Sequence, residues 1–219
     1  NISFKYNLSE NYIFHKFSQF VIVASDEGSG NVKVKMVSAS NHANALSESG
    51  LLTYNSWIHI GAVYDYVNNT QSLYINGSKM TVIINEAPAT NHPQDVHFFG
   101  SFNANANTQS TTMYLTEVYF FTKVLTDAEV LLLYENEGNV NNLYTNLANY
   151  FRCSSFITQG SFNYITDSSP QDQNNFLYMT GIFSLSTDIP TLNPPVNNIN
   201  SSNITFTHNS VLKTLRPSD

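Results

Sequence analysis

The stretch from Asn55 to Asn85 constrains the fold most, because it reads as three consecutive strands joined by two turns. Its second turn, Asn76-Gly77, lies between the apolar run Leu73 to Ile75 and the β-branched run Thr81 to Ile84. Asn-Gly flanked by such runs is the strongest short-range signal for a hairpin, since a type I′ turn needs two consecutive positive φ angles. The stretch therefore predicts a central antiparallel hairpin.

The strand before this hairpin is expected to cover Ser56 to Tyr66, where apolar residues partly alternate with tyrosine and histidine. Val67 to Thr70 then predicts a turn, because asparagine tolerates a left-handed backbone. Further strands are predicted at Ile2 to Leu8, Gln19 to Ala24, Asn31 to Ser38, Gly50 to Thr53, Asp95 to Ser101 and Thr111 to Thr122, and Asn41 to Ser49 is predicted to be a polar loop. The pattern is that of an all-β chain.

One short helix is predicted after the last of these strands. Thr126 is a suitable N-cap and Glu129 follows three residues later, which is the pattern of a capping box. The apolar stripe from Val130 to Tyr134 supplies a buried face, and the helix is expected to end near Glu137-Gly138.

The charge balance excludes several classes of partner. The chain has 219 residues, only 11% of them charged, with a net charge of −7 and nine basic residues. These basic residues are spread singly, so no positive face is available to neutralise nucleic-acid phosphates. No apolar run approaches the roughly 18 residues of a membrane-spanning helix, so direct membrane insertion is not expected. The start, without Met or a signal-peptide pattern, is expected to belong to a processed form or a fragment.

Cysteine and asparagine give further limits. Cys153 is the only cysteine, which excludes an internal disulfide and any zinc site built on cysteines. Six Asn-x-Ser/Thr sequons occur, at Asn1, Asn7, Asn68, Asn76, Asn200 and Asn203. About six are expected by chance from this composition. Glycosylation is predicted at Asn7, Asn68, Asn76, Asn200 and Asn203, of which Asn68 and Asn76 fall on the two predicted turns.

Three motifs in order carry a family resemblance. They are Ser-Trp-Ile-His-Ile-Gly-Ala-Val-Tyr-Asp ending at Asp65, Leu-Tyr-Ile-Asn-Gly ending at Gly77, and Glu-Val-Tyr-Phe-Phe-Thr-Lys-Val-Leu-Thr-Asp-Ala-Glu-Val ending at Val130. Together they resemble the laminin-G-like branch of the concanavalin A-like lectin/glucanase superfamily, over roughly Ile2 to Glu137. Thr116 and Tyr119 depart from the family pattern, which usually has an aspartate and a basic residue at these places.

The resemblance implies an antiparallel jelly-roll β-sandwich with one short helix, over residues 1–138. Residues 139–190 resemble the opening of a second such module and are predicted to be a partial second β module, or strands that complete a neighbouring sandwich. We slightly favour a tandem array. Residues 191–219 are predicted to be a Pro- and Asn-rich linker followed by one or two strands.

Catalysis is not expected from this sequence. A glucanase needs two carboxylates at a defined separation, and the family's Glu-x-Asp-x-x-Glu spacing is absent. Glu117 stands alone among apolar neighbours, so a structural role is favoured. Calcium is the metal considered, with weak candidates at Asp26, Glu27, Asp65 and Asp95, and no other cofactor is expected.

The predicted function is that of a non-catalytic structural or adhesive module of a larger cell-surface, extracellular or filament glycoprotein, which associates with other chains of the same or a related type. The first alternative is a carbohydrate-binding lectin module, with or without a dependence on calcium, in which Tyr64, Tyr66, Tyr74 and Tyr119 form a sugar-stacking platform. Packing is the favoured role of these tyrosines. The second alternative is an accessory structural subunit of an intracellular protist assembly, since Asn richness suits an AT-rich protist genome.

Overall fold

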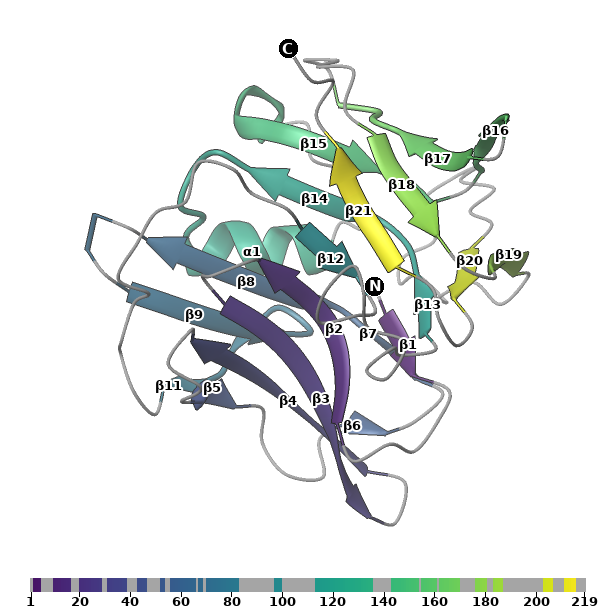
Figure 1. The fold of residues 1–219 in the computed structure, drawn as a ribbon. Coiled ribbons are helices and arrows are strands. Elements are labelled where there is room, and N and C mark those ends of the chain that lie inside the picture. Colours follow the sequence, from purple (N-terminus) through teal and green to yellow (C-terminus); the bar gives the residue numbers. More distant parts are fainter. Residues whose placement is uncertain are drawn as a thin grey trace.

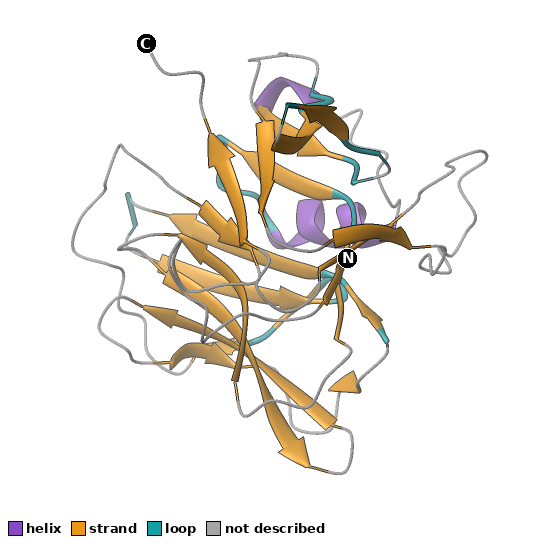
Figure 2. Ribbon diagram, turned by 45° about the vertical axis from the view of Figure 1, so that its right-hand side comes forward, coloured by secondary structure: helices purple, strands orange, loops and turns teal. Residues whose placement is uncertain are grey.

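A computed structural model gives the fold of the chain (Figure 1). It describes residues 2–4, 10–16, 20–28, 31–38, 43–46, 52–53, 56–65, 67–68, 70–82, 97–99, 113–135, 143–153, 155–160, 162–169, 176–180, 183–186, 203–206 and 211–215. Strands make up most of this part of the chain, and every strand pair in it is antiparallel. The prediction of an all-β fold is confirmed (Figure 2).

The predicted central hairpin is present. Strands β8 (Ile60–Asp65) and β9 (Thr70–Ile75) pair along their whole length, and β10 (Ser78–Lys79) returns against β9. At the sharp turn, Asn76 and Gly77 have φ angles of 49° and 78°, as a type I′ turn requires. The Asn76 side chain also fixes the turn, because its Oδ1 accepts a hydrogen bond of 3.0 Å from the backbone N–H of His59.

Strands β2, β3 and β4 form the middle of the largest sheet. Its order is β11-β5-β4-β3-β2-β12-β21-β18-β17-β16, with β6 also paired to β4. The alternation that predicted β4 is visible in its burial: Val32, Val34 and Met36 are all 0% exposed. The bounds are β2 (Glu10–Lys16), β3 (Phe20–Gly28), β4 (Asn31–Ser38), β5 (Ala43–Leu46), β6 (Leu52–Thr53), β11 (Thr81–Val82), β12 (His97–Phe99), β16 (Ile157–Gln159), β17 (Phe162–Thr166), β18 (Phe176–Thr180) and β21 (Val211–Leu215).

Two of these strands differ from the sequence prediction. Residues 43–46, predicted as loop, form β5 and pair with β4. Strand β2 was not predicted at all, because its Tyr, His and Lys residues dilute the alternation of apolar positions. These residues form a strand because they pair with β3, although their own sequence pattern does not predict one.

The largest sheet forms the first layer of the sandwich. The second layer contains the hairpin sheet, with the order β10-β9-β8, and two further small sheets. One has the order β19-β20-β13-β1-β7, and the other consists of β14 and β15. The bounds are β1 (Ile2–Phe4), β7 (Trp57–Ile58), β13 (Met113–Leu115), β14 (Val118–Phe121), β15 (Leu147–Phe151), β19 (Phe183–Ser186) and β20 (Asn203–Phe206). A core of apolar side chains from both layers fills the space between them, including Ile13, Ile22, Ile58, Leu73 and Leu115.

The single long strand predicted over Thr111 to Thr122 is wrong in one respect, since it is broken. It divides into β13 and β14 at Thr116 and Glu117, and Glu117 has a φ of 51°. A positive φ on a residue with a side chain is uncommon and interrupts regular strand pairing. Glu117 therefore does not follow the alternation of side-chain direction in the two flanking strands.

Helix α1 (Asp127–Glu135) covers the outer face of the second layer (Figure 1). The capping box is confirmed: the Thr126 N–H donates to Glu129 Oε2 at 2.9 Å, and the Glu129 N–H donates to Thr126 Oγ1 at 3.3 Å. Val130, 2% exposed, packs in a second apolar cluster with Tyr74, Leu125, Leu143, Leu147 and Tyr150. Helix α1 thus buries part of the outer face of the second layer.

The C-terminal strands pair with strands of the first 138 residues. β20 pairs with β13, β21 pairs with β12, and β15, which follows the short 3-10 helix η1 (Tyr144–Asn146), pairs with β14. The predicted division of the chain at residue 138 stays a prediction. In the described part, no helix is long and apolar enough to cross a membrane.

Candidate functional site

A cavity of about 320 Å³ lies between β8 and β14. Ile13, Phe14 and Ile22 reach it from the large sheet, whereas Val130 and Leu133 reach it from α1. The polar side chains of its described lining are His59, Tyr64, Thr116, Glu117, Tyr119 and Lys123. The cavity therefore extends through the second layer, from the sandwich core to the helix.

Glu117 is the one carboxylate of that lining. Its Oε2 accepts hydrogen bonds from the hydroxyl of Tyr119 at 3.1 Å and from the hydroxyl of Tyr150. The two tyrosine rings stack on each other with centroids 4.6 Å apart and planes inclined by 11°. Its other oxygen, Oε1, is buried and has no hydrogen-bond partner among the described residues. The break between β13 and β14 turns this side chain toward the tyrosines.

Both tyrosines act as donors to the carboxylate. Burial raises the pKa of Tyr119 and of Tyr150 well above the ordinary value of a phenol, and the nearby charge of Glu117 raises each pKa further. Both hydroxyls therefore keep their protons over the physiological range. The arrangement is a carboxylate held by two neutral phenols, which stabilises the fold without creating a nucleophile.

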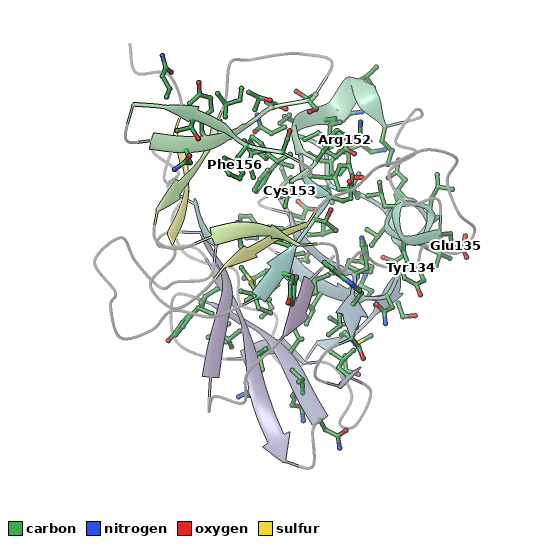
Figure 3. All side chains as sticks on the ribbon, turned by 90° about the vertical axis from the view of Figure 1, so that its right-hand side faces the viewer. Tyr134, Glu135, Arg152, Cys153 and Phe156 are labelled. Atoms are coloured by element: carbon green, nitrogen blue, oxygen red, sulfur yellow. The ribbon has the colours of Figure 1, made fainter. Side chains whose placement is uncertain are left out.

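Arg152 and Cys153 lie at the end of β15 near Phe156, away from Tyr134 and Glu135 on the last turn of α1 (Figure 3). Cys153 is a buried free thiol, and its Sγ donates to the carbonyl of Phe151 at 3.6 Å. Burial raises the pKa of this thiol, so it stays protonated and unreactive. The Arg152 Nε is buried and has no hydrogen-bond partner in the described part of the chain.

His59, which lies between β7 and β8, also lines the cavity. Its ring lies 5.7 Å from the ring of Tyr134, between centroids, and its Nδ1 is buried with no hydrogen-bond partner among the residues described. Burial lowers the pKa of His59 to about 3, so the imidazole is neutral at physiological pH. A neutral imidazole with a buried Nδ1 gives the cavity a polar atom and no charge.

Four other carboxylates hold turns and helix ends. Asp65 Oδ1 accepts from the backbone N–H groups of Val67 and Asn68, each at 3.0 Å, and the Asn68 hydrogen bond lowers the pKa of Asp65. Asp127 accepts from the Tyr74 hydroxyl at 2.6 Å and from Lys79 at 3.1 Å. The other two are Glu129 in the capping box and Asp167, whose Oδ1 accepts from the backbone N–H groups of Tyr150 and Ser169 at 2.8 Å each.

The predicted calcium ligands are not brought together in the described part of the chain, where no three His, Cys, Asp or Glu side chains gather as a metal site. Asp26 and Glu27 lie near the end of β3, and Asp65 lies at the end of β8. Asp95 lies outside the described residues. The calcium site stays a prediction.

The predicted glycosylation sites are placed only in part. Asn68 is exposed on its turn, and its Nδ2 donates to Asp65 Oδ2 at 2.7 Å. Asn76 is half-buried and tied to His59. Asn203 is the first residue of β20, while Asn7 and Asn200 lie outside the described residues.

The described tyrosines of the predicted sugar platform pack against the interior. Tyr74 is 1% exposed, and Tyr119 packs in the cluster beneath α1. Tyr64 packs against the sandwich core, and Tyr66 lies outside the described residues. The described members of this set therefore serve packing, the role favoured from the sequence.

Sequence reasoning missed Tyr150 and Asp167. Tyr150 reaches Glu117 across 33 positions of sequence, and Asp167 reaches the backbone of Tyr150 across 17. These contacts depend on the pairing of β14 with β15, and no local sequence pattern around Glu117 predicts that pairing.

A family model described as the concanavalin A-like lectin/glucanases superfamily, of laminin-G type, matches residues 5–131. The chain belongs to this superfamily. The laminin-G-like resemblance and the jelly-roll sandwich are thereby confirmed. No curated protein matches the chain.

One similar solved structure is that of a protein from Bacteroides ovatus ATCC 8483, provisionally described as carbohydrate binding. It is 19% identical and has a TM-score of 0.51, and the match covers 76% of this chain and 47% of that one. At 19% identity, the similarity between the two proteins is one of fold alone. The match spans about half the length of that protein.

Proposed function

We propose that this laminin-G-like chain is a non-catalytic structural or adhesive module of a larger cell-surface, extracellular or filament glycoprotein. One observation carries the proposal: five carboxylates of the described part are engaged in holding the fold. They are Asp65, Glu117, Asp127, Glu129 and Asp167. Each accepts hydrogen bonds from backbone or side-chain donors of its own surroundings, which supports a structural role for all five.

Glycoside hydrolysis is disfavoured by the lining of the cavity. Most retaining and inverting glycosidases need two carboxyl groups, about 5–5.5 Å or 6.5–9.5 Å apart. Glu117 is the only acid among the described residues that line the cavity. A single carboxylate whose Oε2 is bound by two phenols lacks the second carboxyl group that this chemistry requires.

A second candidate, carbohydrate binding, is favoured by the Bacteroides ovatus protein, whose fold is similar and to which carbohydrate binding has been provisionally assigned. In this candidate, calcium would be an optional cofactor at a rim loop. Glycans and other protein chains of the same or a related type are the partners that the two candidates require.

A glycan array, probed with the purified chain in calcium and again with EDTA, separates the two candidates. The structural module predicts no specific glycan binding in either condition. Specific binding would overturn it in favour of the carbohydrate-binding module, and loss of that binding with EDTA would add calcium to the site.

Mass spectrometry of the natural protein tests the proposed location at the cell surface. Asn68 is exposed and its turn is accessible, so a secreted glycoprotein should carry a glycan there. Asn76 is half-buried and bonded to the backbone of His59, so it should be modified less. Unmodified asparagine at both positions would contradict the extracellular assignment and favour an intracellular assembly.

A further inference from the structure

Strand β16 forms one outer edge of the large sheet (Figure 1). It is the last strand in the order of that sheet, and among the described strands it pairs with β17 alone. All three of its residues are exposed, and Ile157 is 47% exposed. A Cβ added at Gly160, directly after the strand, would meet nothing within 4 Å. The strand and its turn are therefore accessible from solvent.

The backbone of Thr158 faces outward from this edge. Gln159 pairs with Phe162 across a two-residue loop, and Ile157 pairs with Tyr164. The pair that closes such a loop exchanges both of its hydrogen bonds, and hydrogen-bonded pairs alternate with non-hydrogen-bonded pairs along an antiparallel ladder. Thr158 therefore belongs to a non-hydrogen-bonded pair, and its N–H and C=O point away from β17. Another strand could bond to both groups.

The polar side chains of β16 are held by β17. Thr158 Oγ1 donates to Asn163 Oδ1 at 2.6 Å, and Gln159 Oε1 accepts from the Tyr164 hydroxyl at 3.1 Å. These side chains already have partners within the hairpin, so they do not compete for the outward backbone groups. Side chains that are fixed before association lose less conformational freedom when it occurs. The edge is thus preorganised for pairing with another strand.

This edge lacks the usual protection against such pairing. Native edge strands commonly carry a charged side chain or a proline, which keeps other strands away. The run from Cys153 to Thr166, which contains β16 and β17, has no charged residue, histidine or proline. At the opposite end of the sheet, β11 begins two residues after the exposed Lys79. The two ends therefore differ, and β16 is the end without a nearby charge in its own hairpin.

We propose that β16 is a self-association edge, at which two copies of this chain pair antiparallel about a two-fold axis at Thr158. The Thr158 residues of the two copies then face each other, and the N–H of each donates to the C=O of the other. Ile157 of each copy lies opposite Gln159 of the other, which covers part of the exposed isoleucine. The contact is self-complementary, so one edge serves both copies.

The charge of the chain favours a second copy at this place. Two copies with a net charge of −7 repel each other, so they associate best where no like charges meet. The neutral hairpin meets this condition. Helix α1 also exposes apolar side chains, but it carries Asp127, Glu129 and Glu135. A basic partner would find no opposite charge on β16, whereas an identical neutral edge fits it.

Pairing through three residues of each copy is a weak contact. A standard stable interface has about 20–30 residues on each side, so single pairs of this kind form transiently and at high concentration. Where many copies are held close together, as in a filament or a surface layer, repeated weak contacts add to a high avidity. The inference rests on the proposed function, in which this module associates with chains of its own type.

Sedimentation velocity of the 219-residue chain, from about 10 µM to about 1 mM, tests the edge. Thr158→Pro removes an N–H that faces outward, so the fold should tolerate it. Ile157→Lys places a charge on the edge, and Val67→Lys is the control, because it makes the same charge change at a residue that is 89% exposed. The wild type and the control should self-associate as concentration rises. Self-association should weaken at least tenfold in both edge variants, since each pair of copies loses hydrogen bonds or gains repulsion.

Thermal unfolding at low concentration shows whether each variant keeps the fold, and Ile157→Lys tests the edge alone if Thr158→Pro does not fold. A wild type that stays monomeric at about 1 mM would overturn the inference. Self-association that is unchanged in the folded edge variants would overturn it as well. The glycan array tests the proposed function separately, so a chain that is monomeric and binds no glycan would remove this edge and leave the structural module standing.

Discussion

Glu117 shows how one residue can interrupt a strand and gain a structural role. Its φ of 51° takes it out of the alternation between Leu115 and Val118, which both face the core. The side chain is then free to meet the hydroxyls of Tyr119 and Tyr150. A buried carboxylate is costly unless it is hydrogen-bonded, so these two donors determine whether the break is tolerated.

The change Tyr150→Phe removes one of those donors while keeping the ring. We expect it to lower the free energy of unfolding by about 1–3 kcal/mol, because Glu117 is left with a single donor. The change Tyr164→Phe is the control, since its hydroxyl bonds the exposed Gln159 at 3.1 Å and should cost under about 0.5 kcal/mol. Denaturant unfolding of both variants measures the difference, and equal costs would contradict the role given to Tyr150.

His59 makes stability depend on pH. Its folded pKa of about 3 is below the unfolded value of 6.5, so the unfolded chain binds the extra proton between these values. Stability is therefore complete above about pH 6.5 and falls as the pH is lowered toward 3. From pH 7 to pH 5.5 this group alone should cost about 1 kcal/mol.

The comparison of the wild type with His59→Gln isolates that effect, because carboxylates with lowered pKa values, such as Asp65, lose stability in the same direction in both proteins. Urea unfolding at pH 7, 6.3 and 5.5 should show a shallower pH dependence in the variant. Parallel curves would mean that the imidazole is not buried as the structure places it.

At the scale of elements, the hairpin turn and helix α1 depend on each other. A Cβ at Gly77 would lie 2.8 Å from Leu131 Cδ1 and 3.0 Å from Tyr134 Cδ1, so the turn packs closely beneath the helix. Glycine is needed here for two reasons, its φ of 78° and this close approach. The turn residue thereby fixes where α1 can lie.

The change Gly77→Ala should therefore lower the free energy of unfolding by more than the backbone strain at positive φ alone would. We expect a loss of about 2–3 kcal/mol, against about 1 kcal/mol for Gly160→Ala, where φ is also positive at 64° but nothing lies within 4 Å of the added Cβ. Thermal or denaturant unfolding compares the two variants. If both cost the same, the packing of α1 on the turn is not as described.

Elements with their own local signals were predictable from the sequence. The Asn76-Gly77 turn and the Thr126 capping box depend on neighbouring residues, so both could be predicted from the sequence. Strand β5 could not be predicted, because its residues form a strand only through their pairing with β4 and β11. For the same reason the Glu117 and Tyr150 contact was missed, because strand pairing alone brings these residues together.

At the scale of the whole molecule, the C-terminal strands contribute to both layers. β21 lies between β12 and β18 in the large sheet, and β20 lies between β13 and β19 in the second layer. A strand in the interior of a sheet forms hydrogen bonds along both edges, so its loss leaves two neighbours unpaired. The stability of the first sandwich should therefore depend on residues after 202.

A chain ending at Ser202 tests this dependence. It lacks β20 and β21, and we expect its melting temperature to fall by about 10 °C, whereas a chain ending at Leu215 keeps both strands and should melt like the full chain. Differential scanning calorimetry of the three chains measures this. An unchanged melting temperature would instead favour a separable C-terminal module, as the tandem-array interpretation predicts.

We propose that this laminin-G-like sandwich is non-catalytic and that Glu117 has a structural role. The most direct measurement is the release of reducing ends from a panel of β-glucans and other glycans, with the wild type and Glu117→Gln side by side. The account predicts that neither protein releases reducing ends above the blank. Release by the wild type that disappears in Glu117→Gln would contradict the claim and make Glu117 a catalytic residue.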